Sequence, residues 1–190
     1  MSYDPTILPP NLPVPEDDGA ADHLRGAHMP PIALPSTDGG SMRVDVVPDG
    51  AERLVVYAFP RTGRPDERPL VPDWDEIPGA RGCTPETCGF RDHAADLRAV
   101  GAAVAGLSTQ DTEYQRELVE RLRLPFPLLT DTDLALTRAL DLPTFEAAGH
   151  TLLKRLTLVV RDGAVEQVFY PVFPPDTHAA AVLEWCRSQT

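Results

Sequence analysis

The chain has 190 residues, a length that favours one domain, and 42% of them are hydrophobic, enough for a sizeable core. Its 17 basic and 29 acidic residues give a net charge of −12, which argues against nucleic acids and anionic membrane surfaces as partners. No apolar run approaches the roughly 20 residues of a spanning helix, the first residues do not resemble a secretory signal, and three cysteines are too few for a disulfide scaffold. We therefore expect a cytoplasmic protein without a transmembrane segment.

The first part of the chain is rich in proline and in acidic residues. Nine of the 21 prolines and half of the net negative charge fall within residues 1–50. Such a composition is typical of a segment that does not build its own core. The sequence predicts an extended N-terminal arm over residues 1–29, partly disordered or wrapped over the surface, and a folded domain over residues 30–190.

The domain is predicted to begin with a small β-hairpin and a buried strand. Apolar residues flank a glycine turn within residues 32–46, and a continuous apolar run covers residues 54–59. A long loop rich in proline and glycine follows, and long loops inside compact domains are usually functional or disordered. The next helix is predicted to begin at Thr84, a good N-cap, with Pro85 in its first turn.

The rest of the chain alternates between strands and helices. Apolar spacing, caps and turn residues predict, in order, strand 102–107, helix 111–123, strand 128–129, helix 133–141, strands 156–160 and 164–170, and helix 176–187. This order predicts an α/β fold with a mixed central sheet flanked by helices, preceded by the hairpin and the arm.

Two cysteines lie near the start of the helix predicted after the long loop. Cys83 comes just before the helix, where unpaired N–H groups and the helix dipole favour the thiolate and lower the pKa. Cys88 lies one turn inside, and five residues on a continuous helix separate two Cα atoms by about 8.5 Å. A disulfide tolerates at most about 7 Å, so the two cysteines can pair only if the first turn unwinds.

The segment from Gly82 to Asp92, with the pattern Gly82-Cys83-Thr84-x-x-x-Cys88-x-Phe90-Arg91-Asp92, resembles the active-site segment of peroxiredoxins. It is most similar to the bacterioferritin comigratory, or Q-type, subfamily of the AhpC/TSA group. The similarity extends in order over residues 28–188 and includes the segments Val56–Pro60, Gly106–Thr109, Leu128–Asp131 and Lys154–Val159.

The resemblance implies a thioredoxin-like fold and a thiol-dependent peroxidase that reduces hydrogen peroxide or organic hydroperoxides. It implies that Cys83 is the peroxidatic nucleophile, that Cys88 resolves its sulfenic acid as an intramolecular disulfide, and that Arg155 supplies a fixed positive charge. Pro60, Gly82 and Thr84 would line the substrate site. The implied partners are a hydroperoxide and thioredoxin or a similar thiol reductant, with no cofactor and no metal, in a monomer or weak homodimer.

Two departures from the family pattern keep an alternative open. Cys83 follows Pro60 by 23 residues where the family has seven, so residues 61–80 read as an inserted loop that contains Trp74. The family's threonine three residues before the cysteine is Ala80 here, and Thr84 or Thr62 would have to replace its hydroxyl. The alternative is a peroxiredoxin-like fold reused as a redox sensor or a biosynthetic enzyme with weak peroxidase activity.

Other sequence features favour simpler interpretations. Cys83, Cys88 and His93 have a spacing that is not standard for a metal site. Cys186, next to Trp185 on the last predicted helix, is expected to be a small buried residue rather than a second resolving thiol.

Overall fold

The computed structural model describes residues 4–189. Its strands and helices are as follows: β1 (Ala33–Pro35), β2 (Ser41–Arg43), β3 (Arg53–Ala58), η1 (Trp74–Glu76), α1 (Cys83–Ala99), β4 (Ala102–Ser108), α2 (Thr112–Leu122), β5 (Leu128–Thr130), α3 (Ala135–Leu140), β6 (Thr144–Ala147), β7 (His150–Leu153), β8 (Leu156–Arg161), β9 (Ala164–Phe169), η2 (Pro175–Thr177) and α4 (His178–Ser188). None of the helices within residues 4–189 is both long enough and apolar enough to cross a membrane.

The central sheet has five strands in the order β5-β4-β3-β8-β9. Strands β3, β4 and β5 are parallel, whereas β8 pairs antiparallel with β3 and with β9. All six residues of β3 are buried, as expected for a central strand that is covered on both faces. The sheet is therefore mixed, and its middle strand leads directly toward the loop that precedes Cys83.

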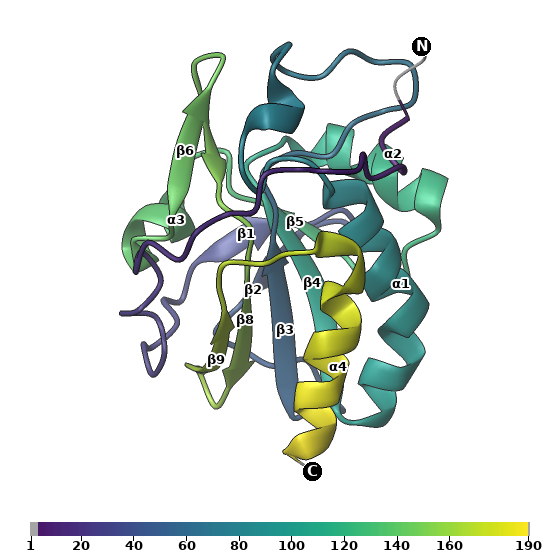
Figure 1. The fold of residues 1–190 in the computed structure, drawn as a ribbon. Helices are drawn as coiled ribbons and strands as arrows, with labels where there is room; N and C mark the ends of the chain where they lie inside the picture. Colours follow the sequence, from purple (N-terminus) through teal and green to yellow (C-terminus); the bar gives the residue numbers. More distant parts are fainter. Residues whose placement is uncertain (1–3, 190) are drawn as a thin grey trace.

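Both faces of this sheet are covered (Figure 1). On one face, α1, α2 and α4 bury a cluster that includes Phe90, Leu118 and Val182, with α1 packed beside α4. On the other face, α3, the β1–β2 hairpin and part of the N-terminal segment cover the alternate residues of the same strands. The α/β thioredoxin-like fold with a mixed central sheet is confirmed.

A second hairpin, formed by β6 and β7, is missing from the sequence prediction. Its two strands pair antiparallel from Thr144 with Leu153 to Ala147 with His150. The turn residues Ala148 and Gly149 both have positive φ angles, of 49° and 76°, as a tight two-residue hairpin turn requires. Alanine rarely adopts this conformation, so the usual asparagine-glycine or aspartate-glycine signal is absent from the sequence.

The predicted start of α1 at Thr84 is wrong, because the helix begins at Cys83 with Gly82 as its N-cap. Gly82 has a φ of 107°, a conformation that glycine adopts without strain, and the side chain of Pro175 fills the space that a Cβ would need. The hydroxyl of Thr84 makes no capping bond and lies inside the first turn. Cys83 is therefore part of the helix rather than the residue ahead of it.

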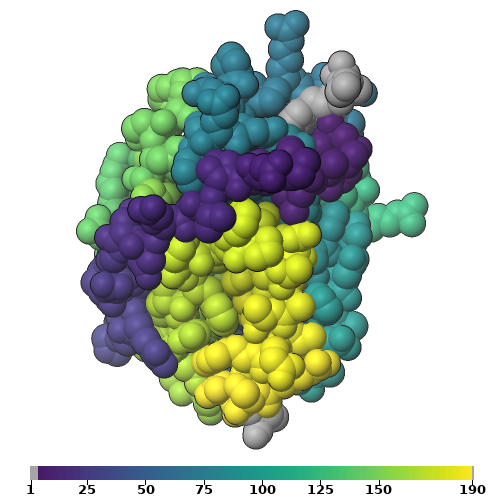
Figure 2. Space-filling view, in the orientation of Figure 1, coloured from purple at the N-terminus to yellow at the C-terminus, as the bar shows by residue number. Residues whose placement is uncertain are grey.

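The N-terminal segment lies against the body of the molecule (Figure 2). Leu24 and Met29 are buried in the core, and the backbone N–H and C=O groups around Ala27 pair with Val165 of β9. The segment before them crosses the surface near the start of α1 and that of α4 (Figures 1 and 2). The division at residues 29 and 30 stays a prediction, as does the status of 61–80 as an insertion.

Candidate active site

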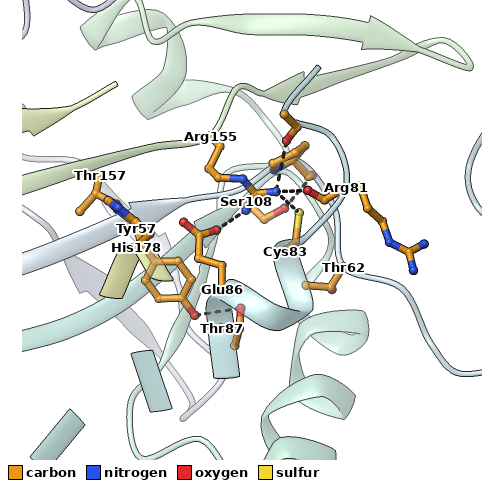
Figure 3. Close-up of polar contacts among 12 residues, drawn as sticks. Tyr57, Thr62, Arg81, Cys83, Glu86, Thr87, Ser108, Arg155, Thr157 and His178 are labelled. Atoms are coloured by element: carbon orange, nitrogen blue, oxygen red, sulfur yellow. Dashed lines mark hydrogen bonds and ion pairs between the residues drawn. The ribbon is translucent and has the colours of Figure 1, made fainter. Parts of the chain in front are cut away.

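The candidate site lies where the N-terminus of α1 meets the residues just before β8. Cys83 opens α1, and Arg155 stands in the two-residue link between β7 and β8. Because β8 runs beside β3 in the middle of the sheet, this link brings Arg155 next to the helix start. Figure 3 shows the guanidinium of Arg155 between Cys83 and Glu86.

The sulfur of Cys83 is almost fully enclosed, since the residue is 2% exposed. Nη2 of Arg155 donates a hydrogen bond to Sγ at 3.2 Å, and the thiol donates to the backbone oxygen of Ala80 at 3.5 Å. A cation at this distance stabilises a thiolate more than a neutral thiol. Two of the predicted catalytic residues, Cys83 and Arg155, are thus in direct contact.

Arg155 is itself held by several acceptors. Nη1 pairs with the carboxylate of Glu86, and Nη2 also donates to the backbone oxygens of Gly79 and Arg81, both at 3.2 Å. The residue is 3% exposed, and its Nε makes no hydrogen bond within the described residues. The guanidinium therefore has a fixed position and shares its charge between the sulfur of Cys83 and the carboxylate of Glu86.

Burial works against the low thiol pKa that the sequence predicts. Desolvation raises the pKa of Cys83, Arg155 opposes this rise, and Glu86 adds to it. Desolvation likewise raises the pKa of Glu86 to about 7, although Arg155 acts in the opposite direction. Desolvation therefore outweighs the lowering of the Cys83 pKa that the helix dipole was expected to produce. Because the carboxylate of Glu86 raises the same pKa, the ionisation of Cys83 depends on the charge of Glu86.

A buried histidine lies behind these groups. Nε2 of His178 is hydrogen bonded with the hydroxyl of Thr157 at 2.8 Å, and the ring stacks edge-on against Phe90. Burial, with a smaller contribution from Arg155, lowers the pKa of His178 to about 3. Because the imidazole is neutral at ordinary pH, it adds no second positive charge beside Arg155.

The three residues predicted to line the substrate site, Pro60, Gly82 and Thr84, are all buried. Pro60 is buried two residues after the end of β3, and its backbone oxygen accepts a hydrogen bond from the hydroxyl of Ser108 at 3.3 Å. Gly82 is buried under Pro175, and the hydroxyl of Thr84 is buried without a hydrogen bond in the described structure. Thr84 is therefore the better candidate to replace the family hydroxyl that Ala80 lacks.

The hydroxyl of Thr62, the other candidate to replace the family hydroxyl, is already hydrogen bonded to another side chain. Its hydroxyl donates to Oε1 of Gln110 at 3.1 Å, and its backbone N–H donates to the same atom at 2.8 Å. The amide of Gln110 returns a hydrogen bond to the backbone oxygen of Thr62 at 3.2 Å. This reciprocal pairing anchors the start of the loop near Cys83.

Cys88 is not brought to Cys83 in this conformation. Both are reduced thiols within α1, and Cys88 is half-buried. The ideal helical separation of about 8.5 Å therefore applies, which is beyond disulfide reach. Cys186 is buried on α4, as predicted, and Trp74 is also buried.

Sequence reasoning missed the role of Glu86. An acidic residue in the first turn of a helix interacts favourably with the helix dipole, and this alone does not predict its burial. In the structure Glu86 is fully buried, and one of its two oxygens, Oε1, has no hydrogen bond within the described residues. The three-residue spacing from Cys83 was the available signal, because such residues share a helix face.

Metal binding finds no support in the described part of the chain. Within residues 4–189, no three His, Cys, Asp or Glu side chains are grouped closely enough to hold a metal ion.

Comparisons with known proteins agree with one another. The Redoxin family matches residues 24–183. The chain is 27% identical to a chloroplastic peroxiredoxin Q of Sedum lineare, over 99% of this chain and 91% of that protein. It is also 27% identical to peroxiredoxin Bcp of Escherichia coli, over 85% of this chain and 94% of that protein. The solved structure of peroxidoxin BcpB from Mycobacterium tuberculosis is 26% identical, with a TM-score of 0.70, over 88% of this chain and 99% of that one.

Proposed function

Because the chain belongs to the Redoxin family and is a thiol peroxidase of the peroxiredoxin Q type, we propose that Cys83 is its peroxidatic cysteine. The peroxiredoxin resemblance of the sequence is confirmed, while the roles of single residues belong to this proposal. The observation that carries it is the contact between Nη2 of Arg155 and the sulfur of Cys83 at the N-terminus of α1. A thiolate held by a fixed, buried guanidinium is placed for nucleophilic attack.

In the first step the thiolate of Cys83 attacks one oxygen of a hydroperoxide. A sulfur–oxygen bond forms, the oxygen–oxygen bond breaks, and the leaving oxygen takes up the proton that the thiol lost on ionisation, which gives water or an alcohol. The sulfur is oxidised to sulfenic acid as the peroxide is reduced. Arg155 stabilises the charge that moves from sulfur to the departing oxygen, since its Nη2 already contacts the sulfur of Cys83.

In the second step the thiol of Cys88 attacks the sulfenic acid. The sulfur–sulfur bond forms, the sulfur–oxygen bond breaks, and the oxygen leaves as water with the proton of Cys88. The helical spacing requires the first turn of α1 to unwind before these atoms meet. We place the start of this unwinding at Thr84 and Pro85, in the first turn of α1.

The disulfide is then reduced by exchange with a dithiol protein. We propose thioredoxin or a similar thiol reductant, and hydrogen peroxide or organic hydroperoxides as substrates. A monomer or weak homodimer and a cytoplasmic location stay predictions of the sequence.

A peroxide titration followed by mass spectrometry tests this assignment. One equivalent of hydrogen peroxide is added to the wild type, Cys88→Ser and the control Cys186→Ser, and the masses and crosslinked peptides are determined. We expect a Cys83–Cys88 disulfide in the wild type and in Cys186→Ser, and sulfenic acid at Cys83 in Cys88→Ser. Peroxide consumption that survives in Cys83→Ser would contradict the proposal.

A redox sensor is the second candidate. Ala80 in place of the family threonine and the enclosed, high-pKa sulfur of Cys83 both favour slow oxidation. A sensor would accumulate the oxidised form without rapid turnover by thioredoxin, and steady-state peroxide consumption with thioredoxin and its reductase separates the two functions.

A further inference from the structure

Residues 4–18, here called the N-terminal strap, lie across the segment that immediately precedes Cys83. Figure 2 shows this segment as a purple band over the teal and yellow surface formed by the middle and the end of the chain. Figure 1 shows the same band passing near the start of α1 and the start of α4. The strap therefore covers the residues just ahead of Cys83.

Arg81 ties the strap to this segment. Its Nη2 donates hydrogen bonds to the backbone oxygens of Asp4 and Ile7, both at 2.8 Å, and its side chain is 7% exposed. Nη1 also pairs with Asp75 of the long loop at 3.5 Å. Hydrogen bonds from a charged donor are stronger than those from a neutral donor. Because Arg81 lies two residues before Cys83, these bonds attach the strap close to the start of α1.

Apolar contacts and a second ion pair extend the attachment. Leu8 lies beside Gly82, since a Cβ atom added to Gly82 would be 3.0 Å from the side chain of Leu8. Pro15 lies beside Gly79, where an added Cβ atom would be 3.7 Å from the side chain of Pro15. At the far end, Asp18 accepts hydrogen bonds from Lys154 at 2.6 Å and from Tyr170 at 2.7 Å. The strap is thus fixed on both sides of the segment that enters α1.

The resolving step disturbs this arrangement. Cys88 can displace the oxygen of the Cys83 sulfenic acid as water only after the first turn of α1 has unwound, because the helical spacing exceeds disulfide reach. Unwinding moves Gly82 and Arg81, to which the strap is attached. A contact made only in the helical form stabilises that form and must be given up in the other.

We propose that Arg81 is a positioning residue that holds the start of α1 helical through the N-terminal strap, slows the resolving step, and lets the strap go when the disulfide forms. The inference rests on the pairing of Cys83 with Cys88 in the proposed function. The consequence is a longer-lived sulfenic acid and a strap whose accessibility reports the redox state of the protein.

The rates of the two chemical steps test the role of Arg81. Sulfenic acid formation and disulfide formation are followed after rapid mixing with hydrogen peroxide. In Arg81→Met we expect disulfide formation to be about tenfold faster, because two hydrogen bonds no longer oppose unwinding, while Cys83 oxidation is unchanged. Arg81→Lys keeps one donor group, so its rate of disulfide formation should lie between those of the wild type and Arg81→Met. Deletion of residues 1–12 should give the same rate as Arg81→Met.

Arg68→Met is the matched control, because Arg68 is exposed on the same long loop. It should leave both rates at the wild-type values. Disulfide formation that is unchanged or slower in both Arg81→Met and the deletion would overturn the proposal.

Limited proteolysis with thermolysin tests the release of the strap. The enzyme cleaves next to apolar residues such as Ile7, Leu8 and Leu12, and its access requires local opening. The disulfide is prepared separately with hydrogen peroxide and with diamide, and Cys83→Ser treated with each oxidant is the control. We expect rapid cleavage of the strap in the disulfide form alone, and equal cleavage of the reduced and disulfide forms would overturn the proposal.

The two oxidants separate this inference from the proposed function. A Cys83–Cys88 disulfide that forms with diamide but not with peroxide would contradict the peroxidase assignment, and cleavage of the strap would still decide the inference. A disulfide that forms with neither oxidant would overturn this inference and the resolving role of Cys88, while sulfenic acid at Cys83 would still decide the peroxidase assignment.

Discussion

Arg155 donates a hydrogen bond to the sulfur of Cys83 at 3.2 Å although 71 residues separate them in the sequence. The sheet makes this contact, because the link before β8 ends beside the helix that follows β3. The same guanidinium is paired with Glu86, so three ionisable groups form one buried cluster. The chemistry that we propose depends on how charge is divided among these three groups.

Loss of Arg155 should slow peroxide attack. In Arg155→Met we expect the rate constant for Cys83 oxidation to fall by about a hundredfold, the scale of losing one preorganised charge stabiliser. The variant also leaves Glu86 buried without its partner, at a cost of about 3 kcal/mol in the free energy of unfolding. Stopped-flow oxidation and chemical denaturation measure the two effects.

The double variant Arg155→Met with Glu86→Gln separates these effects. It removes both charges, so most of the stability should return while oxidation stays slow. Recovery of the oxidation rate in the double variant would show that Arg155 acts through folding alone.

Replacement of Glu86 should lower the pKa of Cys83. The carboxylate of Glu86 raises the thiol pKa and competes for the charge of Arg155. Glu86→Gln keeps an oxygen that accepts from Arg155 but removes the negative charge. The thiolate absorbance and the oxidation rate should both shift to lower pH in this variant, and a shift to higher pH would contradict the account.

The same substitution should change how stability depends on pH. Burial raises the pKa of Glu86 in the folded protein from 4.5 to about 7, so the folded state holds its proton more tightly than the unfolded state. The stability that this contributes is fully present below pH 4.5 and is lost as the pH rises to about 7. Denaturation across this range should show a smaller decline in Glu86→Gln than in the wild type.

Gly82 should tolerate no side chain. Gly82→Ala combines a left-handed backbone with a clash against Pro175, and we expect a loss of about 2 kcal/mol together with slower Cys83 oxidation. Gly39→Ala is a matched control, since Gly39 has a φ of 99° but open space around it. The control should lose about 1 kcal/mol and keep the wild-type oxidation rate, and equal losses would show that packing at Gly82 is unimportant.

Much of this arrangement could be predicted from the sequence. The apolar run that became β3, the alternation of strands and helices, and the cysteine segment led to the correct fold and placed Cys83 at a helix start. Arg155 was found only through the family resemblance, because an arginine before a strand usually lies on the surface. Nothing in the local pattern shows that the sheet will bury it.

The features that escaped prediction depend on contacts between distant segments. Gly82 rather than Thr84 caps α1, because Pro175 and Leu8 occupy the space beside it. Glu86 is buried beside Arg155, which comes from the distant link before β8, and charge alone argued for an exposed side chain. Arg81 is hydrogen bonded to the backbone of Asp4, a contact between distant segments that the spacing of residues in the sequence does not predict.

The rate constant for oxidation of Cys83 by hydrogen peroxide, measured in Cys88→Ser, tests the central claim most directly. This variant stops at the sulfenic acid, so the measured rate belongs to the first chemical step. We predict a rate constant far above that of a free cysteine thiolate at the same pH, with the sulfenic acid confined to Cys83. A rate constant equal to that of a free thiolate would contradict the assignment of Cys83 as a peroxidatic cysteine.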